Sequence, residues 1–545
     1  MKKGEKGMKR LLLATTASLI MAALSTAPGH SAEGRKPGEA VQPITVIAPD
    51  WPEMIELLRL LRPNWEKLGF RFEVQHMTLT SLSARTTGEH NAPQMTVNGY
   101  GGAPDRIDPD FFLTELFHSS RAVKGASNYG NYINPEYDGV VDAQRQEMDP
   151  DKRKILVDQA QDILIKDQPG MVLYYNDYIQ AYREDRLDKV VPVMGNGIAL
   201  PYIPWTYYTS TPTGSRDFIR TTTQYDIATL NPFATGEVQN ASLLRWMYAP
   251  FVIRNKDLEI EPWAAESWNV VDSTTVDVVI RSGMKFSDGK PVTVEDVKFT
   301  FDYMDKWKFP SYKRFSDNIA GVEIVDERTV RFKLNQPYAP FVPNILGYAF
   351  IVPKHIWENV TDSPADFAND EAVGYGPFKL GGWEKDQYLH MATNKDWWAA
   401  PKTSGVYWLI VPSIDSQIGM LETGESDIMA WGITPSQVKR LPGGIAAARA
   451  PSHAPREVRF NLDMAPFDDV NVRKAISLAT DRQSVVATLS DGAATPGNDA
   501  YISPKLSWAN KAIGTAAFDI EKARKMLADA GYTWDAEGRI RYPAQ

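Results

Sequence analysis

The chain has 545 residues, 43% of them hydrophobic, and a formal net charge of -9. A chain of this length can form two or three hydrophobic cores. Its net negative charge does not favour binding to nucleic acid or to an anionic membrane surface. The sequence contains no cysteine, which excludes disulfides, thiolate metal sites, cysteine nucleophiles and a lipid-modified N-terminal cysteine. We therefore expect a soluble, multi-lobed protein with no nucleic-acid partner. We also expect a monomer without a cofactor.

The first 32 residues have the pattern of a targeting segment. Five basic residues between Lys2 and Arg10 precede the apolar run Leu11 to Leu24, which is too short to span a bilayer comfortably. This predicts a secretory signal peptide over 1–32, with a membrane-anchored helix as the alternative. Residues 33–42 contain Pro and Gly and are predicted to be a linker. Export without cysteine suits a bacterial periplasm and no lipid anchor.

The next part of the chain alternates apolar strands with helices of 3.6-residue periodicity, which predicts an α/β fold. Pro63 is expected to kink the first helix, and Asp149-Pro150 is a good cap and first residue for the second. The predicted strands are 44–48, 70–74, 95–98 and 170–175, and the predicted helices are 52–69 and 150–166.

The segment Gly283 to Met304 is the most informative in the chain. It follows a β-branched stretch, 275–281, that reads as a strand, and it opens with the turn Ser287-Asp288-Gly289. Thr293 is placed to cap a helix whose first turn carries Glu295 and Asp296 at the positive end of the dipole. The buried face of that helix is predicted to comprise Val294, Val297, Phe301 and Met304.

This segment resembles the signature of the periplasmic solute-binding proteins of dipeptide, oligopeptide and nickel importers, extracellular solute-binding protein family 5. Further segments resemble the same family, including Thr229-Leu-Asn-Pro-Phe233, Pro262 to Trp268, Gly374 to Phe378, Val472 to Asp481 and Phe518 to Leu527. The resemblance implies a two-lobed, type II periplasmic-binding-protein fold of the large oligopeptide-binding kind, with a hinge and an interlobe cleft.

The order of these segments is rotated. Asn134 to Asp177 looks like the region that normally ends such a protein, yet it lies near the start, and each motif occurs once. We interpret the chain as a circular permutant, in which 211–545 followed by 41–210 restores the family order. The former ends would be joined around Ser210 to Gly214. The helix 519–530 and Gln545 should then lie close to the strand 44–48 and the linker before it.

The resemblance also implies a division into domains. One lobe, 172–459, would be continuous, and the other would be split between 41–171 and 460–545. The two crossings, near Met171 and near Arg459, would form the hinge. A ligand would bind between the lobes and favour the closed form through contacts made only when both lobes touch it.

Site residues are expected at the faces that border the cleft. Asp105 precedes Asp108-Pro109 by the spacing at which peptide-binding relatives place the carboxylate that pairs with a peptide's α-amino group. Such a contact is charge-assisted. An ordinary loop aspartate is the alternative. Dipeptide binders also hold the ligand carboxylate with an arginine after the first strand, where this chain has Asp50 and Trp51. The remaining aromatic candidates are Tyr100, Tyr225, Tyr375 and Trp431, whose rings suit sugars as well as cationic or aromatic ligands. Glu237, in the loop 234–238, is a further candidate.

The sequence thus predicts the substrate-binding component of an ABC importer, which delivers a peptide, an opine-like compound or an oligosaccharide to a membrane permease and catalyses no reaction. Peptide-like ligands are favoured by Asp105, and oligosaccharides by the aromatics and the missing arginine. A secreted glycoside hydrolase is the alternative of another class, although no hydrolase motif is present and the seven histidines form no close ligand pair. A ligand-reporting receptor or a peptide-holding chaperone would use the same cleft.

Overall fold

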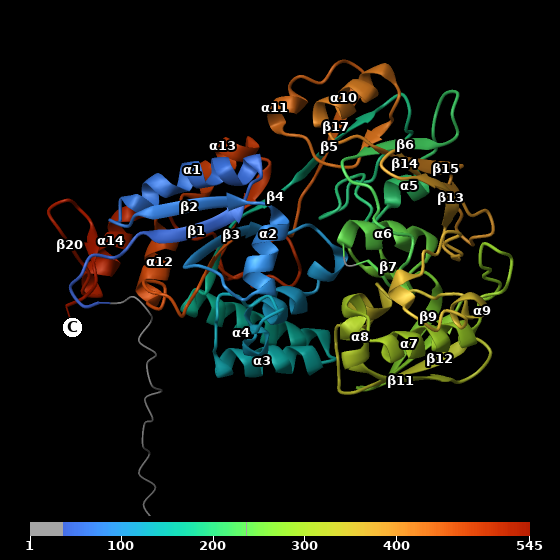
Figure 1. Ribbon diagram of the computed structural model, residues 1–545, viewed down its shortest axis with the longest axis horizontal. Coiled ribbons are helices and arrows are strands. Elements are labelled where there is room, and N and C mark those ends of the chain that lie inside the picture. The colour runs from blue at the N-terminus through green and yellow to red at the C-terminus, as the bar shows by residue number, and fades with distance from the viewer. Residues whose placement is uncertain (1–35, 236, 545) are drawn as a thin grey trace, which may run out of the picture.

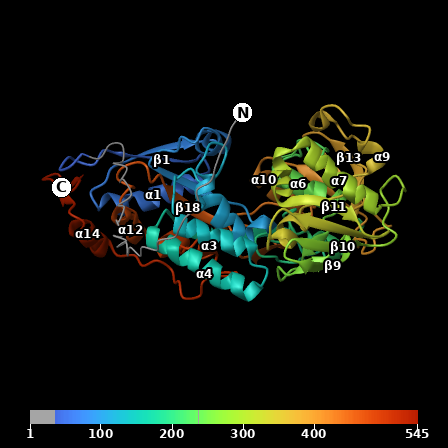
Figure 2. The same ribbon diagram turned by 90° about the horizontal axis from the view of Figure 1, so that it is seen from below.

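The computed structural model describes residues 36–235 and 237–544, so the predicted signal peptide lies outside the described residues. The chain folds into two lobes that lie side by side along its long axis (Figure 1). A view turned by 90° shows the same division (Figure 2). Across the described ranges, no helix is both long enough and apolar enough to cross a membrane.

One lobe contains both ends of the described chain, and we call it the split lobe. Its centre is a six-stranded sheet whose strands, in spatial order, are β19 (Ala494–Pro496), β4 (Gly170–Asn176), β18 (Pro455–Phe460), β3 (Met95–Gly99), β1 (Ile44–Pro49) and β2 (Phe72–Met77). Strand β1 pairs in parallel with β2 and β3, and β18 runs antiparallel to β3 and β4. Its helices are α1 (Pro52–Glu66), α2 (Leu79–Ser83), α3 (Pro135–Gln146), α4 (Pro150–Asp167), α12 (Val470–Leu478), α13 (Arg482–Ser490) and α14 (Ile520–Asp529).

The two extremities of the described chain pack together in the split lobe. After α14 the chain forms the small ribbon β20 (Thr533–Trp534) and β21 (Ile540–Arg541). The backbone N–H of Ile540 donates to the Gly69 carbonyl at 3.1 Å, and Val41 N–H donates to the Ile540 carbonyl at 2.9 Å. The Trp534 indole donates to the Leu68 carbonyl at 2.7 Å. Residues 38–41, which the sequence places in a linker, thus pair with residues 540–543.

The continuous middle of the chain forms the second lobe, which we call the continuous lobe. Its seven-stranded sheet has the spatial order β13 (Phe378–Glu384), β14 (Tyr388–Thr393), β15 (Gly405–Ile410), β6 (Ile219–Thr223), β16 (Ile428–Met429), β5 (Tyr178–Arg183) and β17 (Ile445–Ala450). The smaller sheets are β11 (Ile319–Ile324), β12 (Thr329–Leu334), β10 (Thr275–Ile280) and β9 (Ala265–Asp272), and the pair β7 (Val252–Arg254) and β8 (Ile260–Pro262). Its helices are α5 (Trp205–Thr209), α6 (Val238–Met247), α7 (Val294–Trp307), α8 (Lys313–Asn318), α9 (Lys354–Trp357), α10 (Ile414–Thr423) and α11 (Pro435–Val438).

The chain passes from one large sheet to the other at two places, Asp177 between β4 and β5, and residues 451–454 between β17 and β18. The sequence placed these crossings near Met171 and Arg459, and both positions lie inside strands of the six-stranded sheet. Strands β4 and β18 pair with each other along their length, so neither can be divided between lobes without breaking a shared ladder. Each crossing therefore comes at a strand end.

Helix α7 forms as the sequence predicts. The Thr293 hydroxyl accepts from the Asp296 N–H at 3.4 Å, and the Asp296 carboxylate accepts from the Thr293 N–H at 2.9 Å, which completes a capping box. Val294, Val297 and Phe301 are buried on one face. The first turn thus fixes where the helix begins, and its apolar stripe packs into the core of the continuous lobe.

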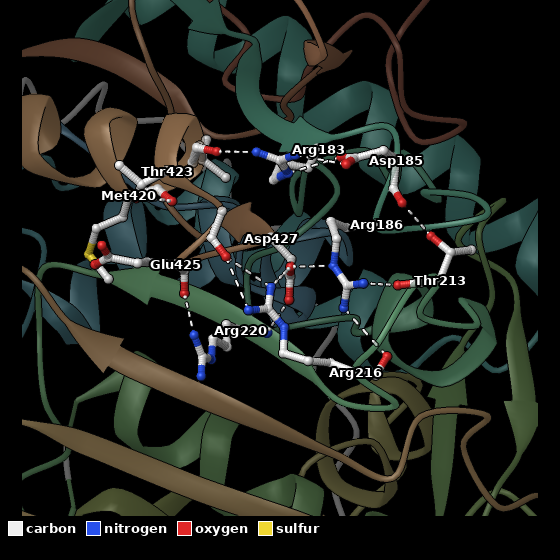
Figure 3. A network of polar contacts seen from close by, with 12 residues as sticks. Arg183, Asp185, Arg186, Thr213, Arg216, Arg220, Met420, Thr423, Glu425 and Asp427 are labelled. Atoms are coloured by element: carbon white, nitrogen blue, oxygen red, sulfur yellow. Dashed lines mark hydrogen bonds and ion pairs between the residues drawn. The ribbon is translucent and has the colours of Figure 1, made fainter.

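The segment where the permutation would have joined two former ends is held by a buried ionic network (Figure 3). The Asp427 carboxylate accepts from Arg186 Nε at 3.1 Å, from Arg216 Nη2 at 2.8 Å and from the Arg220 N–H at 2.8 Å. Arg186 also donates to the Thr213 carbonyl. These contacts fasten the connection between β5 and β6 to the start of β16.

Candidate functional site

The loop that carries Asp105 reaches from the split lobe toward the continuous lobe. It follows β3 and ends in a short 3-10 turn, Pro104–Arg106. Gly102 lies so close to Gly195 that a Cβ at position 102 would collide with the Gly195 carbonyl group. The glycines of this loop therefore permit the close approach that positions Asp105 at the lobe boundary.

The Asp105 carboxylate bonds to two side chains of the continuous lobe. Oδ2 lies 3.2 Å from Arg314 Nη1, and Oδ1 accepts from the Tyr348 hydroxyl at 2.9 Å. The same hydroxyl accepts from the Asp105 backbone N–H at 2.7 Å. Asp105 thus forms an ionic contact between the lobes, and we call Asp105, Arg106, Arg245, Arg254, Arg314 and Tyr348 the interlobe site.

Burial raises the pKa of the Asp105 carboxyl, but the charges of Arg314 and Arg106 and the Tyr348 hydroxyl outweigh it and hold the pKa below its ordinary value. The carboxylate is therefore ionised near neutral pH. It can accept from a ligand cation, provided that the cation takes the place of Arg314.

Two arginines of the continuous lobe border a small cavity at this site. Arg245 comes from α6 and Arg254 ends β7, and the cavity of about 40 Å³ is also lined by Pro104, Tyr202 and Tyr348. The Arg245 guanidinium lies over the Tyr348 ring, 4.3 Å from its centroid. A volume of this size accommodates a carboxylate or a water molecule, whereas a whole solute requires the lobes to part further.

His453 lies in the second crossing and ties it to the loop of Asp105. Its ring is fully buried, with Nε2 3.4 Å from the Ala103 carbonyl oxygen. Burial, with the neighbouring charges of Arg106 and Arg254, lowers its pKa to about 4. His453 is therefore neutral at physiological pH.

This burial predicts a pH-dependent stability. Between pH 6.5 and 4 the unfolded chain binds a proton at His453 that the folded chain does not. The free energy of unfolding therefore falls by up to about 3 kcal/mol as the pH falls through this window. The free energy of unfolding, measured by urea titration at several pH values, should fall accordingly. His453→Gln should reduce the dependence of this free energy on pH. The matched change at an exposed histidine, His76→Gln, should leave that dependence unchanged. An unaltered slope in His453→Gln would contradict the assignment.

Of the other predicted site residues, Tyr100 alone adjoins the interlobe site. The Arg106 guanidinium lies 5.4 Å from the centre of the Tyr100 ring, and the ring packs edge-on against Phe111 and Phe112. The Tyr100 hydroxyl accepts from Arg459 at 3.3 Å. Tyr100 therefore packs beneath the loop of Asp105, and its side chain is partly exposed to solvent.

The structure corrects the prediction that Tyr375 borders the cleft. Its side chain is 1% exposed, packs against Phe286 and donates to the Ala249 carbonyl inside the continuous lobe. A ring buried in this way offers no face to a solute. A glycine-rich turn in the sequence does not reveal whether its aromatic residue points into the core or into a cleft.

The remaining candidates do not line the cavity. Tyr225 is exposed, with its ring edge-on to Trp431 at 5.5 Å. Trp51 packs partly on the core of the split lobe. Asp50 and Glu237 are exposed. The structure thus brings Asp105 and Tyr100 together and leaves these five residues away from the interlobe cavity.

Sequence reasoning missed Arg245, Arg254 and Arg314. A signal was present for the first, because Arg245 interrupts the apolar run Leu243 to Phe251, and a cation inside such a run needs a special environment. Within the described ranges, no group of three or more His, Asp or Glu side chains is placed to hold a metal ion.

Two comparisons match parts of the sequence to known proteins. Residues 259–545 match the model of the bacterial extracellular solute-binding proteins, family 5 Middle. The chain is 28% identical over 319 residues to the glutathione-binding protein GsiB of Salmonella typhi, a match that covers 56% of this chain and 60% of the relative. The chain therefore spans about 60% of the length of the curated relatives that it matches.

Solved structures are similar to part of this chain. The protein NikZ of Campylobacter jejuni, in complex with Ni(L-His), has a TM-score of 0.49 and 22% identity, over 60% of this chain and 66% of that one. The periplasmic oligopeptide-binding protein of Thermotoga maritima has a TM-score of 0.49 and 23% identity, over 59% and 64%.

Proposed function

Because the chain belongs to family 5 of the bacterial extracellular solute-binding proteins, we propose that it binds a small solute between its lobes and delivers it to the permease of an ABC importer. The observation that carries this proposal is the ionic contact of Asp105 with Arg314 and Tyr348. A solute that joins these groups touches both lobes at once, and such contacts favour the closed form. Binding of this kind makes and breaks no covalent bond.

A peptide-like solute fits this site better than an oligosaccharide. The ionised Asp105 carboxylate suits an α-amino group, and the curated relatives are named for glutathione, a peptide with one amine and two carboxylates.

The lobes turn about the crossings at Asp177 and 451–454, which link the two large sheets. The mature protein works in the periplasm after export by residues 1–32. The circular permutation is supported by the packing of residues 38–41 against 540–543, since both extremities then complete one lobe.

Mass spectrometry of small molecules released from the purified protein tests this function. We expect one intact peptide-like solute, which rebinds in calorimetry with a stoichiometry of one per chain. Release of cleaved sugar from a labelled oligosaccharide would instead identify a hydrolase. A chain that retains nothing and binds neither peptides nor glutathione would contradict the proposal.

Asp105→Ala should weaken the binding of a solute that has a free amine by more than about 1.5 kcal/mol, or more than about tenfold in Kd. The reason is the loss of the carboxylate that would accept a charge-assisted hydrogen bond from the amine in place of Arg314. Isothermal titration calorimetry measures the effect, with the exposed Asp50→Ala as the matched control. Equal affinities of Asp105→Ala and the unmodified chain would refute this role.

A further inference from the structure

Asp105 and Asp108 lie on one loop and are each paired with an arginine, but the two pairs differ in geometry. Asp108 accepts from Arg153 on both oxygens, at 2.8 and 2.7 Å, and these side chains are 3% and 5% exposed. Arg314 meets Asp105 through one nitrogen at 3.2 Å, and these side chains are 34% and 16% exposed. Strong charge-assisted bonds of this kind measure about 2.7 to 2.9 Å and are frequently bidentate. The Asp105–Arg314 pair is therefore the more readily exchanged of the two.

Arg314 has other contacts within its own lobe. It lies in α8, and its guanidinium is 4.6 Å from the centre of the Tyr348 ring and 5.6 Å from that of Phe315. Its Nε is buried and has no hydrogen-bond partner among the described residues. Withdrawal from Asp105 thus costs Arg314 one long hydrogen bond and leaves its contacts with the two rings.

Only one oxygen of Asp105 has to change partner for a solute amine to bind. The Tyr348 hydroxyl donates to Oδ1, whereas Arg314 contacts Oδ2. Arg106 donates to the Gly101 carbonyl at 2.6 Å, and its guanidinium lies over two aromatic rings of the split lobe. Its positive charge therefore stays beside the carboxylate when Arg314 withdraws.

A solute amine and the Arg314 guanidinium are both cations, and both bind the same carboxylate oxygen. We propose that Arg314 is an internal competitor of the solute, which occupies Asp105 Oδ2 in place of the amine and so sets the affinity for amine-bearing solutes. This inference rests on the proposed function and adds a residue that determines its affinity and specificity. A solute without a cation does not need this oxygen, so the competition acts on amine-bearing solutes alone.

Arg314→Gln removes the competitor, and two probes report the effect. These are the tripeptide Ala-Ala-Ala, which has a free amine, and its N-acetylated form, which has none. Calorimetry on the full mature chain should show that Arg314→Gln lowers the Kd of the free-amine peptide about fivefold, the factor that corresponds to a partly exposed ion pair. The Kd of the acetylated peptide should change by less than about twofold. Arg314→Lys keeps a cation near Asp105, so it should leave the Kd of the free-amine peptide close to that of the unmodified chain.

Arg331→Gln is the matched control. Arg331 also belongs to the continuous lobe and is paired with one aspartate, Asp277, and these side chains are 32% and 20% exposed. Both residues lie on the four-stranded sheet, and neither lines the cavity. Arg331→Gln should therefore leave the Kd of both peptides unchanged. Thermal unfolding shows whether each variant is folded.

The outcomes separate the inference from the function on which it rests. If Arg314→Gln binds the free-amine peptide no more tightly than the unmodified chain does, the competition is refuted and solute binding stands. An equal gain for both peptides would also refute it, because Arg314 would then restrain the lobes and not compete for the carboxylate. If neither peptide binds to the unmodified chain or to Arg314→Gln, the peptide-binding function and the competition are refuted together.

Discussion

Replacement of Asp427 by Asn should lower the free energy of unfolding by roughly 3 to 5 kcal/mol. The carboxylate is 1% exposed and accepts from Arg186, Arg216 and the Arg220 backbone. An amide has one acceptor oxygen and turns an NH₂ group toward the guanidinium groups, so two cations lose their counter-ion inside the protein. Urea unfolding followed by circular dichroism measures the change.

Asp185→Asn is the control for this effect. Asp185 lies on the same connection and bonds to Arg183 at 2.7 Å, but its side chain is 58% exposed. Exposed ion pairs contribute from about 0 to 1 kcal/mol, so this change should be small. Similar losses in Asp427→Asn and Asp185→Asn would show that the network around residues 213–216 does not fasten the connection between β5 and β6.

Trp65→Ala should lower the free energy of unfolding by about 3 to 5 kcal/mol, the range for deletion of a large buried aromatic side chain. Trp65 in α1 is fully buried, its indole donates to the Thr480 hydroxyl at 2.9 Å, and its ring lies 5.5 Å from that of Phe72. The contact joins the beginning of the chain to its last third. The variant should therefore destabilise elements from both extremities, which hydrogen exchange can follow in α1 and α12 together.

Two variants show which part of Trp65 matters. Trp65→Phe keeps a ring and removes the indole hydrogen bond, so we expect a loss of about 1 kcal/mol beyond the change in volume. Ile55→Ala lies in the same helix but is 46% exposed, and it should stay within about 0.5 kcal/mol. If Trp65→Ala exposes α1 and leaves α12 protected, the two ends do not unfold as one unit.

The starts of helices could be predicted because the residues that cap a helix are its neighbours in the sequence. The caps at Thr293 and Asp149 define where α7 and α4 begin, and the structure confirms both caps. Pro63 does lie inside α1. The proximity of the chain ends followed from motif order alone, since the family places those segments in one lobe. The hydrogen bonds between residues 38–41 and 540–543 agree with that expectation.

The site could be predicted only in part because its charges come from segments far apart in the sequence. Asp105 meets Arg314 across 209 positions, and no pattern within either segment indicates the partner. Tyr375 was misassigned for the opposite reason, because its turn resembles a binding turn while its ring fills the core. The crossings were misplaced by a few residues because strand ends, unlike helix caps, carry no side-chain signal.

The most direct test of the account is the distance between the lobes with and without solute. The chain has no cysteine, so spin labels attach only at engineered positions, for which we choose the exposed Thr80 in α2 and Asp302 in α7. Pulsed electron paramagnetic resonance should give a broad distribution of distances for the solute-free protein and a shorter, narrower one with the solute that co-purifies. Identical distributions at saturating solute would contradict binding between two closing lobes.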